Sequence, residues 1–204
     1  KPSIDPATQI ELTYVLIPAG ATVPDLDIYE ELIYDENIEW TGSSSGVVVD
    51  FACLTNPYHG LTTIDVGTIG NNDTISFTSA SIIDRTDFQN FIFNIRLKAL
   101  MPSQHRLYIR FYNGTTAVTN EVQSTINKSA ITGYQNISLE LSSFTWATSS
   151  FDTIVFRYNR SGGATTYSGF YLDYIKLQTS VTTVLPINTG IELIGDVTGV
   201  GTTG

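Results

Sequence analysis

The stretch Gly169-Phe-Tyr-Leu-Asp-Tyr-Ile-Lys-Leu177 decides how the fold of this chain is interpreted. Its residues alternate on two faces, one with Phe170, Leu172, Tyr174 and Lys176 and the other with Tyr171, Asp173, Ile175 and Leu177. Period-two spacing of aromatic and β-branched residues predicts a β-strand. Asp173 is the exception, because a carboxylate buried without partners is costly. We therefore expect Asp173 to have a cation, a set of hydrogen-bond donors or an exposed face.

Segments on the N-terminal side of this stretch repeat the strand pattern. They are Val47–Leu54, Leu61–Val66, Thr74–Ala80, Phe91–Leu97, Arg106–Tyr112, Val118–Ile126, Tyr134–Leu141 and Phe151–Tyr158. Tyr29–Tyr34 fits a short helix or a strand, and Thr41–Gly46 is expected to be a flexible loop. Many short strands with almost no helical periodicity predict an all-β protein, specifically a β-sandwich jelly roll.

The chain is expected to have three parts. Residues 1–28 form a proline-punctuated lead-in, residues 29–180 the jelly-roll sandwich, and residues 181–204 a Gly/Thr-rich extension. The extension cannot bury a core of its own and would need neighbouring copies or partner chains. Because the chain starts at Lys1 without a methionine and stops inside a Gly/Thr run, we expect it to be a piece of a longer polypeptide.

Composition and charge narrow the function classes. Charged residues make up 15% of the chain, against roughly 25% in an average globular protein, and aromatic residues make up 11%. This balance is typical of all-β extracellular or virion proteins. The net charge of -10 argues against nucleic acid as a partner. Eight of the ten basic residues lie between Arg85 and Arg160, so the middle of the chain suits an anionic ligand.

Cys53 is the only cysteine, which excludes an intrachain disulfide and a metal–thiolate cluster. Its apolar surroundings predict a small buried side chain. No apolar run approaches the length of a membrane-spanning helix, so we expect no membrane partner.

Residues 34–178 resemble the jelly roll of carbohydrate-binding modules. The order of several pieces carries the resemblance: Tyr34-Asp35-Glu36 with Trp40, Gly60–Ile64, Phe91–Leu97, Leu107–Gly114, Phe151–Ile154 and Phe170–Ile175. In that family an early acidic residue and an aspartate of the last strand often contribute to a structural calcium site, which the resemblance maps to Asp35 and Asp173. Ca²⁺ prefers six to eight oxygen ligands. The alternative is that Asp173 accepts hydrogen bonds from loop amides or pairs with a nearby base.

Polar faces of three strands are the first candidate for a sugar-binding surface, if those strands share a sheet. The candidate residues are Arg96, Tyr108, Arg110, Tyr112 and Arg157, accompanied by Asn94, Lys98 and Asn159. Aromatic rings cover the apolar face of a pyranose, and Arg and Asn bind its hydroxyls or an acidic substituent. The alternative is an ordinary solvated sheet face with Tyr–Arg packing.

Aromatic residues expected in loops form a second candidate platform, comprising Trp146, Tyr58, Tyr167 and the neighbouring His59. Trp40 is interpreted as a core residue. Catalysis has little support, since the two histidines His59 and His105 lie outside any nucleophile motif. We therefore expect no enzymatic activity.

The segment Leu193–Gly204 resembles the Gly-Asp-Val-Thr-Gly repeats of bacteriophage tail-fibre and other virion fibre proteins. This resemblance implies a non-enzymatic fibre domain in a virion that binds cell-surface glycan, forms a homotrimer and contacts other virion proteins. The alternatives are a purely structural virion module, and an extracellular carbohydrate-binding module of a bacterial polysaccharide-degrading enzyme.

Overall fold

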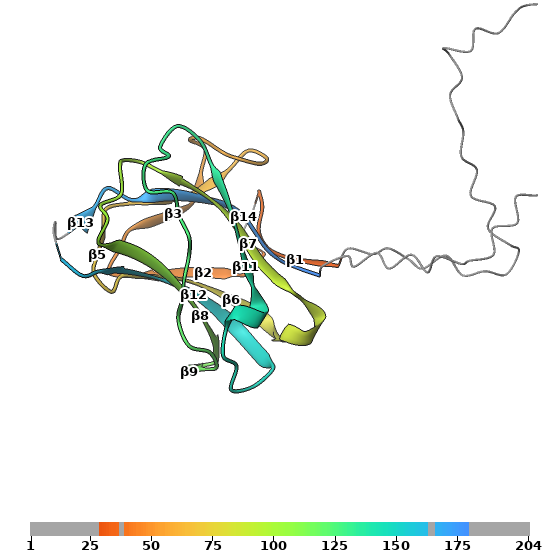
Figure 1. Ribbon diagram of the computed structural model, residues 1–204. Helices are drawn as coiled ribbons and strands as arrows, with labels where there is room; N and C mark the ends of the chain where they lie inside the picture. Colours follow the sequence, from red (N-terminus) through yellow and green to blue (C-terminus); the bar gives the residue numbers. More distant parts are fainter. Residues whose placement is uncertain (1–28, 37–38, 163–165, 180–204) are drawn as a thin grey trace, which may run out of the picture.

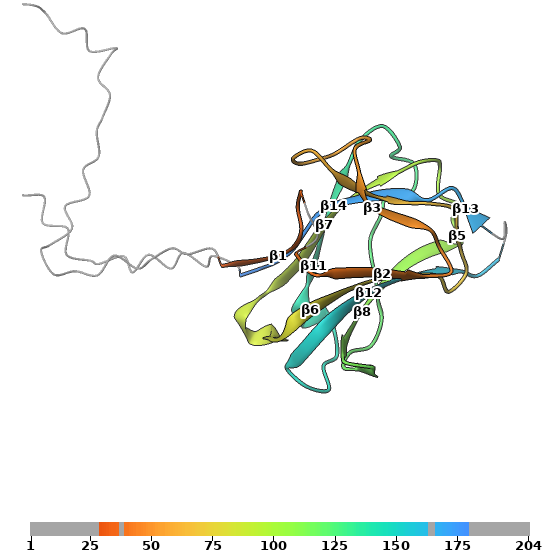
Figure 2. The same ribbon diagram turned by 180° about the vertical axis from the view of Figure 1, so that it is seen from behind.

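The computed structural model describes residues 29–36, 39–162 and 166–179. Two antiparallel sheets pack face to face, as Figures 1 and 2 show from opposite sides. The predicted all-β sandwich of jelly-roll type is therefore confirmed. The lead-in up to residue 28 and the Gly/Thr-rich extension, with its fibre-like repeat, lie outside the described residues.

The first sheet, here the β14 sheet, is centred on the stretch that ends the domain. Its strands, in spatial order, are β11 (Gln135–Glu140), β7 (Asn90–Leu97), β14 (Phe170–Gln178), β4 (Thr63–Val66) and β3 (Val49–Cys53). β1 (Glu30–Tyr34) also pairs with β14, so the segment that fitted a helix or a strand is a strand. The beginning and the end of the described domain are therefore hydrogen-bonded to each other.

The second sheet, here the β8 sheet, contains the middle of the chain. Its order is β10 (Val122–Gln123), β8 (His105–Asn113), β12 (Ser150–Arg160), β6 (Thr74–Asp84) and β2 (Thr41–Ser45), with β9 (Thr116–Ala117) paired to β8. A small ribbon joins β13 (Thr166–Tyr167) to β5 (Ile69–Gly70), and short 3₁₀ turns occur at η2 (Arg85–Asp87) and η3 (Leu141–Ser143). Because β7 and β8 belong to different sheets, their outward side chains lie on opposite faces of the molecule.

Phenylalanine rings from both sheets fill the space between them. Four alternate residues of β7 are buried: Phe91, Phe93, Ile95 and Leu97. The Phe156 ring meets Phe93 edge-on at 5.1 Å and Phe77 at 5.9 Å. Burying a side chain of this size stabilises a fold by about 2–3 kcal/mol. These contacts join the two sheets into one core.

β14 contains a bulge at its centre. Asp173 is paired with Asn94 of β7, whereas Lys176 is paired with Ile92, so one extra residue is accommodated in β14. Tyr174 takes up the extra length with a positive φ of 45°. A bulge of this kind bends a strand and turns its following side chains to the other face.

Because of the bulge, the residues of β14 do not keep the strict alternation between two faces that was expected. Phe170 and Leu172 before it, and Ile175 and Leu177 after it, are all fully buried. The two pairs have opposite parity in the sequence, so Asp173 does not share its face with the apolar residues that follow it. The period-two pattern fails here because a bulge leaves no periodic signal in the sequence.

Thr41–Gly46 was expected to be a flexible loop, and this was wrong, since Thr41–Ser45 forms β2 at the edge of the β8 sheet. The strand pairs with β6, where Thr41 lies opposite Thr78. The Phe51 ring packs directly over Gly42, where a Cβ would lie 2.6 Å from Cε1 of that ring. An aromatic ring that covers a glycine in an edge strand supplies the apolar contact that the strand's own residues lack.

Other expectations need smaller corrections. Val118–Ile126 was expected to be one strand, but within it only Val122–Gln123 is a strand, with Thr119 in an isolated bridge to Trp146. Cys53 lies on edge strand β3 and is half-buried rather than buried. Within the parts of the chain that are described, no helix is both long and apolar enough to cross a membrane.

Candidate functional site

Four of the predicted site residues lie together on the outward face of the β8 sheet. Tyr108 on β8 is directly opposite Arg157 on β12, and Arg110 and Tyr112 follow at alternate positions of β8. We call this group, Tyr108, Arg110, Tyr112 and Arg157, the Tyr–Arg ledge. The condition that these strands share a sheet is met for β8 and β12.

Each arginine of the ledge packs against a tyrosine ring. The Arg157 guanidinium carbon lies 5.1 Å from the Tyr108 ring centre, and that of Arg110 lies 5.6 Å from the Tyr112 ring centre. Cation–π pairs of this kind contribute about 0.5–1 kcal/mol at exposed sites. The packing favours one orientation of each ring.

Glu121 holds Arg157 in place by a two-pronged ion pair. The guanidinium donates from Nε to Oε1 at 2.6 Å and from the adjacent nitrogen to Oε2 at 2.5 Å. A further guanidinium nitrogen donates to Oδ1 of Asn72 at 2.9 Å. The hydrogen bonds from Arg157 lower the pKa of the Glu121 carboxyl. Arg157 therefore orients Tyr108 but has few donors left for a ligand.

Arg110 lies beside a shallow hollow at one end of the ledge. Its Nε donates to the Thr119 carbonyl at 2.9 Å, and it lines a hollow of about 300 Å³ together with Asn120, Thr145 and Trp146. Trp146 is half-buried, and its Nε1 donates to the Leu141 carbonyl at 2.8 Å. The indole is therefore anchored in the domain while it lines the hollow.

Small hydroxyl side chains cover the other half of the same sheet face. The register places Thr74, Ser76 and Thr78 of β6 beside Arg157, Val155 and Thr153 of β12, and Ser45, Ser43 and Thr41 of β2 beyond them. These short side chains project little from the sheet, and they make this half of the face rich in hydroxyl groups. A chain molecule laid across the sheet would meet aromatic rings on one half and hydroxyls on the other.

Arg96 was grouped with the ledge residues, and the structure corrects this. Arg96 belongs to β7 of the β14 sheet, so it lies on the opposite face of the sandwich. Alternation within one strand is visible in a sequence, but the sheet to which the strand belongs depends on long-range pairing.

The second candidate platform, the aromatic residues expected in loops, also differs from the prediction. Tyr167 was expected to lie in a loop, but it forms part of β13 and is buried, with its hydroxyl donating to the Ala99 carbonyl at 2.5 Å. Tyr58 does lie in a loop and is 51% exposed, but this loop crosses the β14 sheet. Trp40 is buried as expected, and its Nε1 donates to Glu31 at 3.0 Å.

Asp173 is fully buried and accepts hydrogen bonds from backbone amides. Its Oδ2 accepts from the Tyr58 N–H at 2.7 Å and its Oδ1 from the Tyr174 N–H at 2.7 Å, and the His59 amide adds another bond. Burial raises the pKa of this carboxyl, while the amide hydrogen bonds oppose the rise. The structure thus shows the loop-amide arrangement that was one of the two interpretations.

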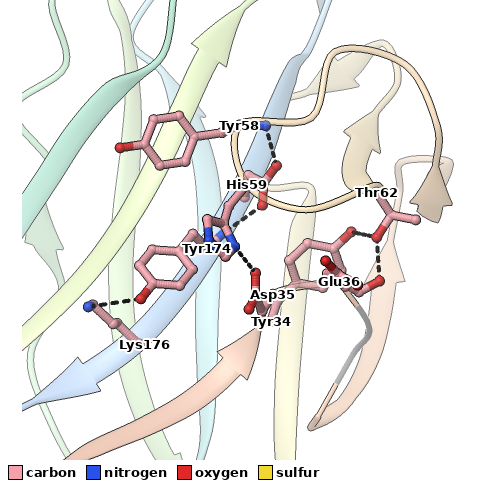
Figure 3. A network of polar contacts seen from close by, with 9 residues as sticks. Tyr34, Asp35, Glu36, Tyr58, His59, Thr62, Tyr174 and Lys176 are labelled. Atoms are coloured by element: carbon pink, nitrogen blue, oxygen red, sulfur yellow. Dashed lines mark hydrogen bonds and ion pairs between the residues drawn. The ribbon is translucent and has the colours of Figure 1, made fainter.

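The charge of Asp35 acts on Asp173, and Asp35 contacts His59 of the same loop (Figure 3). Its Oδ1 is 2.6 Å from Nδ1 of His59. Among the residues that the structure describes, no three His, Cys, Asp or Glu side chains gather as metal ligands. A calcium ion at Asp35 and Asp173 would need further oxygen ligands, since it prefers six to eight. Calcium at Asp35 and Asp173 therefore stays a prediction.

We expect the two histidines to titrate on opposite sides of their ordinary pKa of 6.5. The hydrogen bond to Asp35 raises the pKa of the exposed His59. Burial, with Arg160 and Lys128 nearby, lowers the pKa of His105, whose Nδ1 contacts the Tyr158 hydroxyl. His105 therefore favours folding above pH 6.5 and loses that contribution as the pH falls, whereas His59 does the reverse.

Ring-proton NMR between pH 4 and 9 resolves both titrations, since the chain has two histidines. Asp35→Asn should bring the pKa of His59 back toward 6.5 and leave that of His105 unchanged. Two titrations that coincide near 6.5 would contradict the expectation.

Sequence reasoning missed two residues that organise these surfaces. Glu121 fixes Arg157 from the residue just before β10, and Tyr134 donates from its hydroxyl to the Asn56 carbonyl at 2.8 Å, holding the loop of Tyr58. Neither residue has a motif. Each acts through a partner distant in the sequence, and a single sequence does not reveal such pairings.

Comparisons with known proteins agree with the fold. No family model matches the chain, and no curated protein matches it. Among solved structures, the chain is similar to the family 11 carbohydrate-binding module of Clostridium thermocellum, solved in complex with a β-1,3-1,4-mixed-linked tetrasaccharide. The TM-score is 0.53 at 17% identity, and the match covers 76% of this chain and 98% of that one.

Another solved family 11 module, from the cellulosomal cellulase Lic26A-Cel5E of the same organism, gives a TM-score of 0.54 at 15% identity, covering 76% of this chain and 96% of that one. The family 30 module of the cellulosomal cellulase Cel9D-Cel44B gives 0.51 at 15% identity, with 76% and 99% covered. At these identities the similarity establishes a shared jelly-roll fold, as the sequence resemblance implied.

Proposed function

We propose that this domain is a non-catalytic module that binds glycan chains along the Tyr–Arg ledge. The observation that carries the proposal is the pair of tyrosine rings, Tyr108 and Tyr112, each held by an arginine on an outward sheet face. Tyrosine rings suit the apolar C–H face of a pyranose. Serine and threonine hydroxyls on β6 and β2 provide hydrogen bonds for sugar hydroxyls. The jelly-roll neighbours, named as carbohydrate-binding modules, support the same function.

The charges near the ledge argue against glycosidase chemistry there. Glycoside hydrolysis needs a carboxylic acid with a raised pKa and a second carboxylate. Glu121 is the carboxylate bound to the ledge, and its pKa is lowered because Arg157 bonds both of its oxygens. A carboxylate in that state is a poor proton donor, which favours binding without catalysis.

For the biological context, we propose a virion fibre in which linked copies display the ledge to cell-surface glycan. The support is the repeat-like segment Leu193–Gly204, and weak sugar sites gain affinity when copies are linked. An extracellular module attached to a polysaccharide-degrading enzyme is equally consistent with the structural neighbours. Sedimentation of the full chain tests the difference: a trimer supports the fibre, and a monomer favours the enzyme module.

Loss of either ledge ring should weaken glycan binding. For Tyr108→Ala and Tyr112→Ala we expect affinity for a glycan found on an array to fall about tenfold each, which corresponds to about 1.4 kcal/mol of lost contact. Isothermal titration calorimetry measures this.

Leu100→Ala is the matched control, since Leu100 is an exposed apolar residue away from the ledge. Melting temperatures near that of the wild type ensure that all variants are folded. Unchanged affinity in both tyrosine variants, or no glycan bound by the wild type, would contradict the proposal.

A further inference from the structure

A second cluster of aromatic and basic side chains lies on the opposite face of the molecule, over the β14 sheet. Tyr58 exposes half of its surface, and its ring centre lies 5.3 Å from that of Tyr134. The Tyr134 hydroxyl donates to the Asn56 carbonyl at 2.8 Å and lies 2.9 Å from the Thr63 hydroxyl. The ring pair is therefore fixed on one side and open on the other.

Arg96 supplies this surface with a positive charge, and within the described part of the chain it forms no ion pair with a carboxylate. One guanidinium nitrogen donates to Oδ1 of Asn56 at 2.9 Å, a neutral partner. Across the residues described by the structure, the ion pairs involve other bases, including Lys98 with Asp65 and Arg157 with Glu121. Because a guanidinium has five N–H donors, Arg96 keeps several for a ligand.

Tyr171 extends the surface beside Arg96. It is paired with Arg96 on β7 and with Asp65 on β4, and Lys98 lies 4.8 Å from the centre of its ring. Lys98 neutralises Asp65, so the negative charge of that aspartate is offset at this face. Arg96 thus lies beside aromatic rings without an ion-pair partner among the described residues, in a chain whose overall charge is -10.

The loop that carries Tyr58 is held by its backbone. The Tyr58 N–H donates to Asp173 at 2.7 Å, and Figure 3 shows the phenol ring pointing away from Asp35 and Thr62. The side chain of Tyr58 is thus free to contact a ligand while its main chain is fixed. A surface that is ordered before binding loses less entropy on binding.

We propose that Tyr58, Tyr134, Arg96 and Tyr171 form a second glycan-binding surface, selective for sugars that carry a carboxylate. The Tyr58 ring packs on the sugar ring, and Arg96 binds the carboxylate through its remaining N–H groups, a charge-assisted contact stronger than one to a neutral hydroxyl. This surface is independent of the Tyr–Arg ledge. Ligands on both faces would let one domain bridge two glycan chains.

The test compares uronate oligosaccharides with their methyl esters, since the ester removes the charge and keeps the sugar. The probes are tri-galacturonate and a glucuronate-containing hexasaccharide, measured by calorimetry with the full chain. We expect the acid form of at least one probe to bind at least tenfold more tightly than its ester. Arg96→Gln should abolish that preference, and Tyr58→Ala should weaken binding of the acid about fivefold or more.

Tyr108→Ala separates this proposal from the ledge proposal, because it removes a ring on the other face. It should leave binding of the acid probe unchanged while it weakens binding of a neutral glycan. The proposal is overturned if the wild type binds neither acid probe, if acid and ester bind equally, or if Arg96→Gln keeps the preference. Loss of acid binding in Tyr108→Ala would also overturn it. Melting temperatures of the variants confirm that they are folded.

Discussion

Asp173→Ala should lower the free energy of unfolding by about 3 kcal/mol, because it leaves buried amide donors without acceptors. The carboxylate accepts from Tyr58 and Tyr174, and also from His59. Each unsatisfied buried donor costs about 1–3 kcal/mol, and relief from burying a charge offsets part of the sum. Urea denaturation followed by tryptophan fluorescence measures the loss.

Two further variants make this expectation specific. Asp173→Asn keeps the shape but replaces one acceptor oxygen with a donor, so we expect about half the loss. Asp50→Ala removes an exposed carboxylate that accepts from the nearby Ala52 amide, and should cost less than 1 kcal/mol. If Asp173→Ala were as stable as Asp50→Ala, the carboxylate would not hold the loop in solution.

The predicted calcium ion is tested with the same variants. If Ca²⁺ binds at Asp35 and Asp173, the wild type should melt at a higher temperature in calcium than in chelator, since a ligand of the folded state stabilises it. Asp173→Ala should lose that difference. An identical melting temperature in calcium and chelator would show that the prediction was wrong, and the amide hydrogen bonds alone would then explain the buried carboxylate.

Asp173 and His59 both have raised pKa values, so both contribute more stability at low pH, starting from the different ordinary values of 3.8 and 6.5. Burial raises the pKa of Asp173, so its contribution to stability is largest below its ordinary pKa of 3.8 and is lost as the pH rises through the folded-state value. Desolvation disfavours the charged form of Asp173, and the hydrogen bonds from the amide donors oppose that cost. This explains why the amides of one loop converge on it.

Patterns within single strands predicted much of this fold. β7 and β8 alternate apolar with polar residues in the sequence, and their apolar residues of one parity are buried, for example Phe93 and Ile109. The hydrophobic effect acts residue by residue, so local periodicity records which face of a strand is buried. The jelly-roll class followed from the number and spacing of such strands.

Features that depend on pairing between distant segments were not predictable in the same way. The separation of Arg96 from Arg110 depends on the sheets to which β7 and β8 belong. The bulge at Tyr174 depends on its register with β7, and β2 depends on its pairing with β6. Each is set by contacts between residues far apart in the chain. The candidate residues could therefore be chosen from the sequence, but their division between two faces could not.

Gly169→Ala should destabilise the domain by about 3 kcal/mol or more, which lowers the melting temperature of a domain of this size by roughly 6–12 °C. Gly169 precedes β14 with a φ of 92°, and an added Cβ would overlap the carbonyl oxygens of Val66 and Gly67. These are main-chain atoms at the end of β4, so they cannot rotate away as a side chain does. Relief requires the β4–β14 pairing to shift.

Two other glycines separate the causes of this loss. Gly114 also has a positive φ, 56°, but nothing lies within 4 Å of an added Cβ. Gly114→Ala should therefore cost only the conformational strain, about 1 kcal/mol. Gly133 has an open environment and no positive φ, and its alanine variant should be neutral. Equal losses at Gly169 and Gly114 would mean that strain alone acts and that the two strands are less closely packed than the structure shows. A graded series, with Gly169→Ala far the largest, supports close main-chain packing where β14 begins.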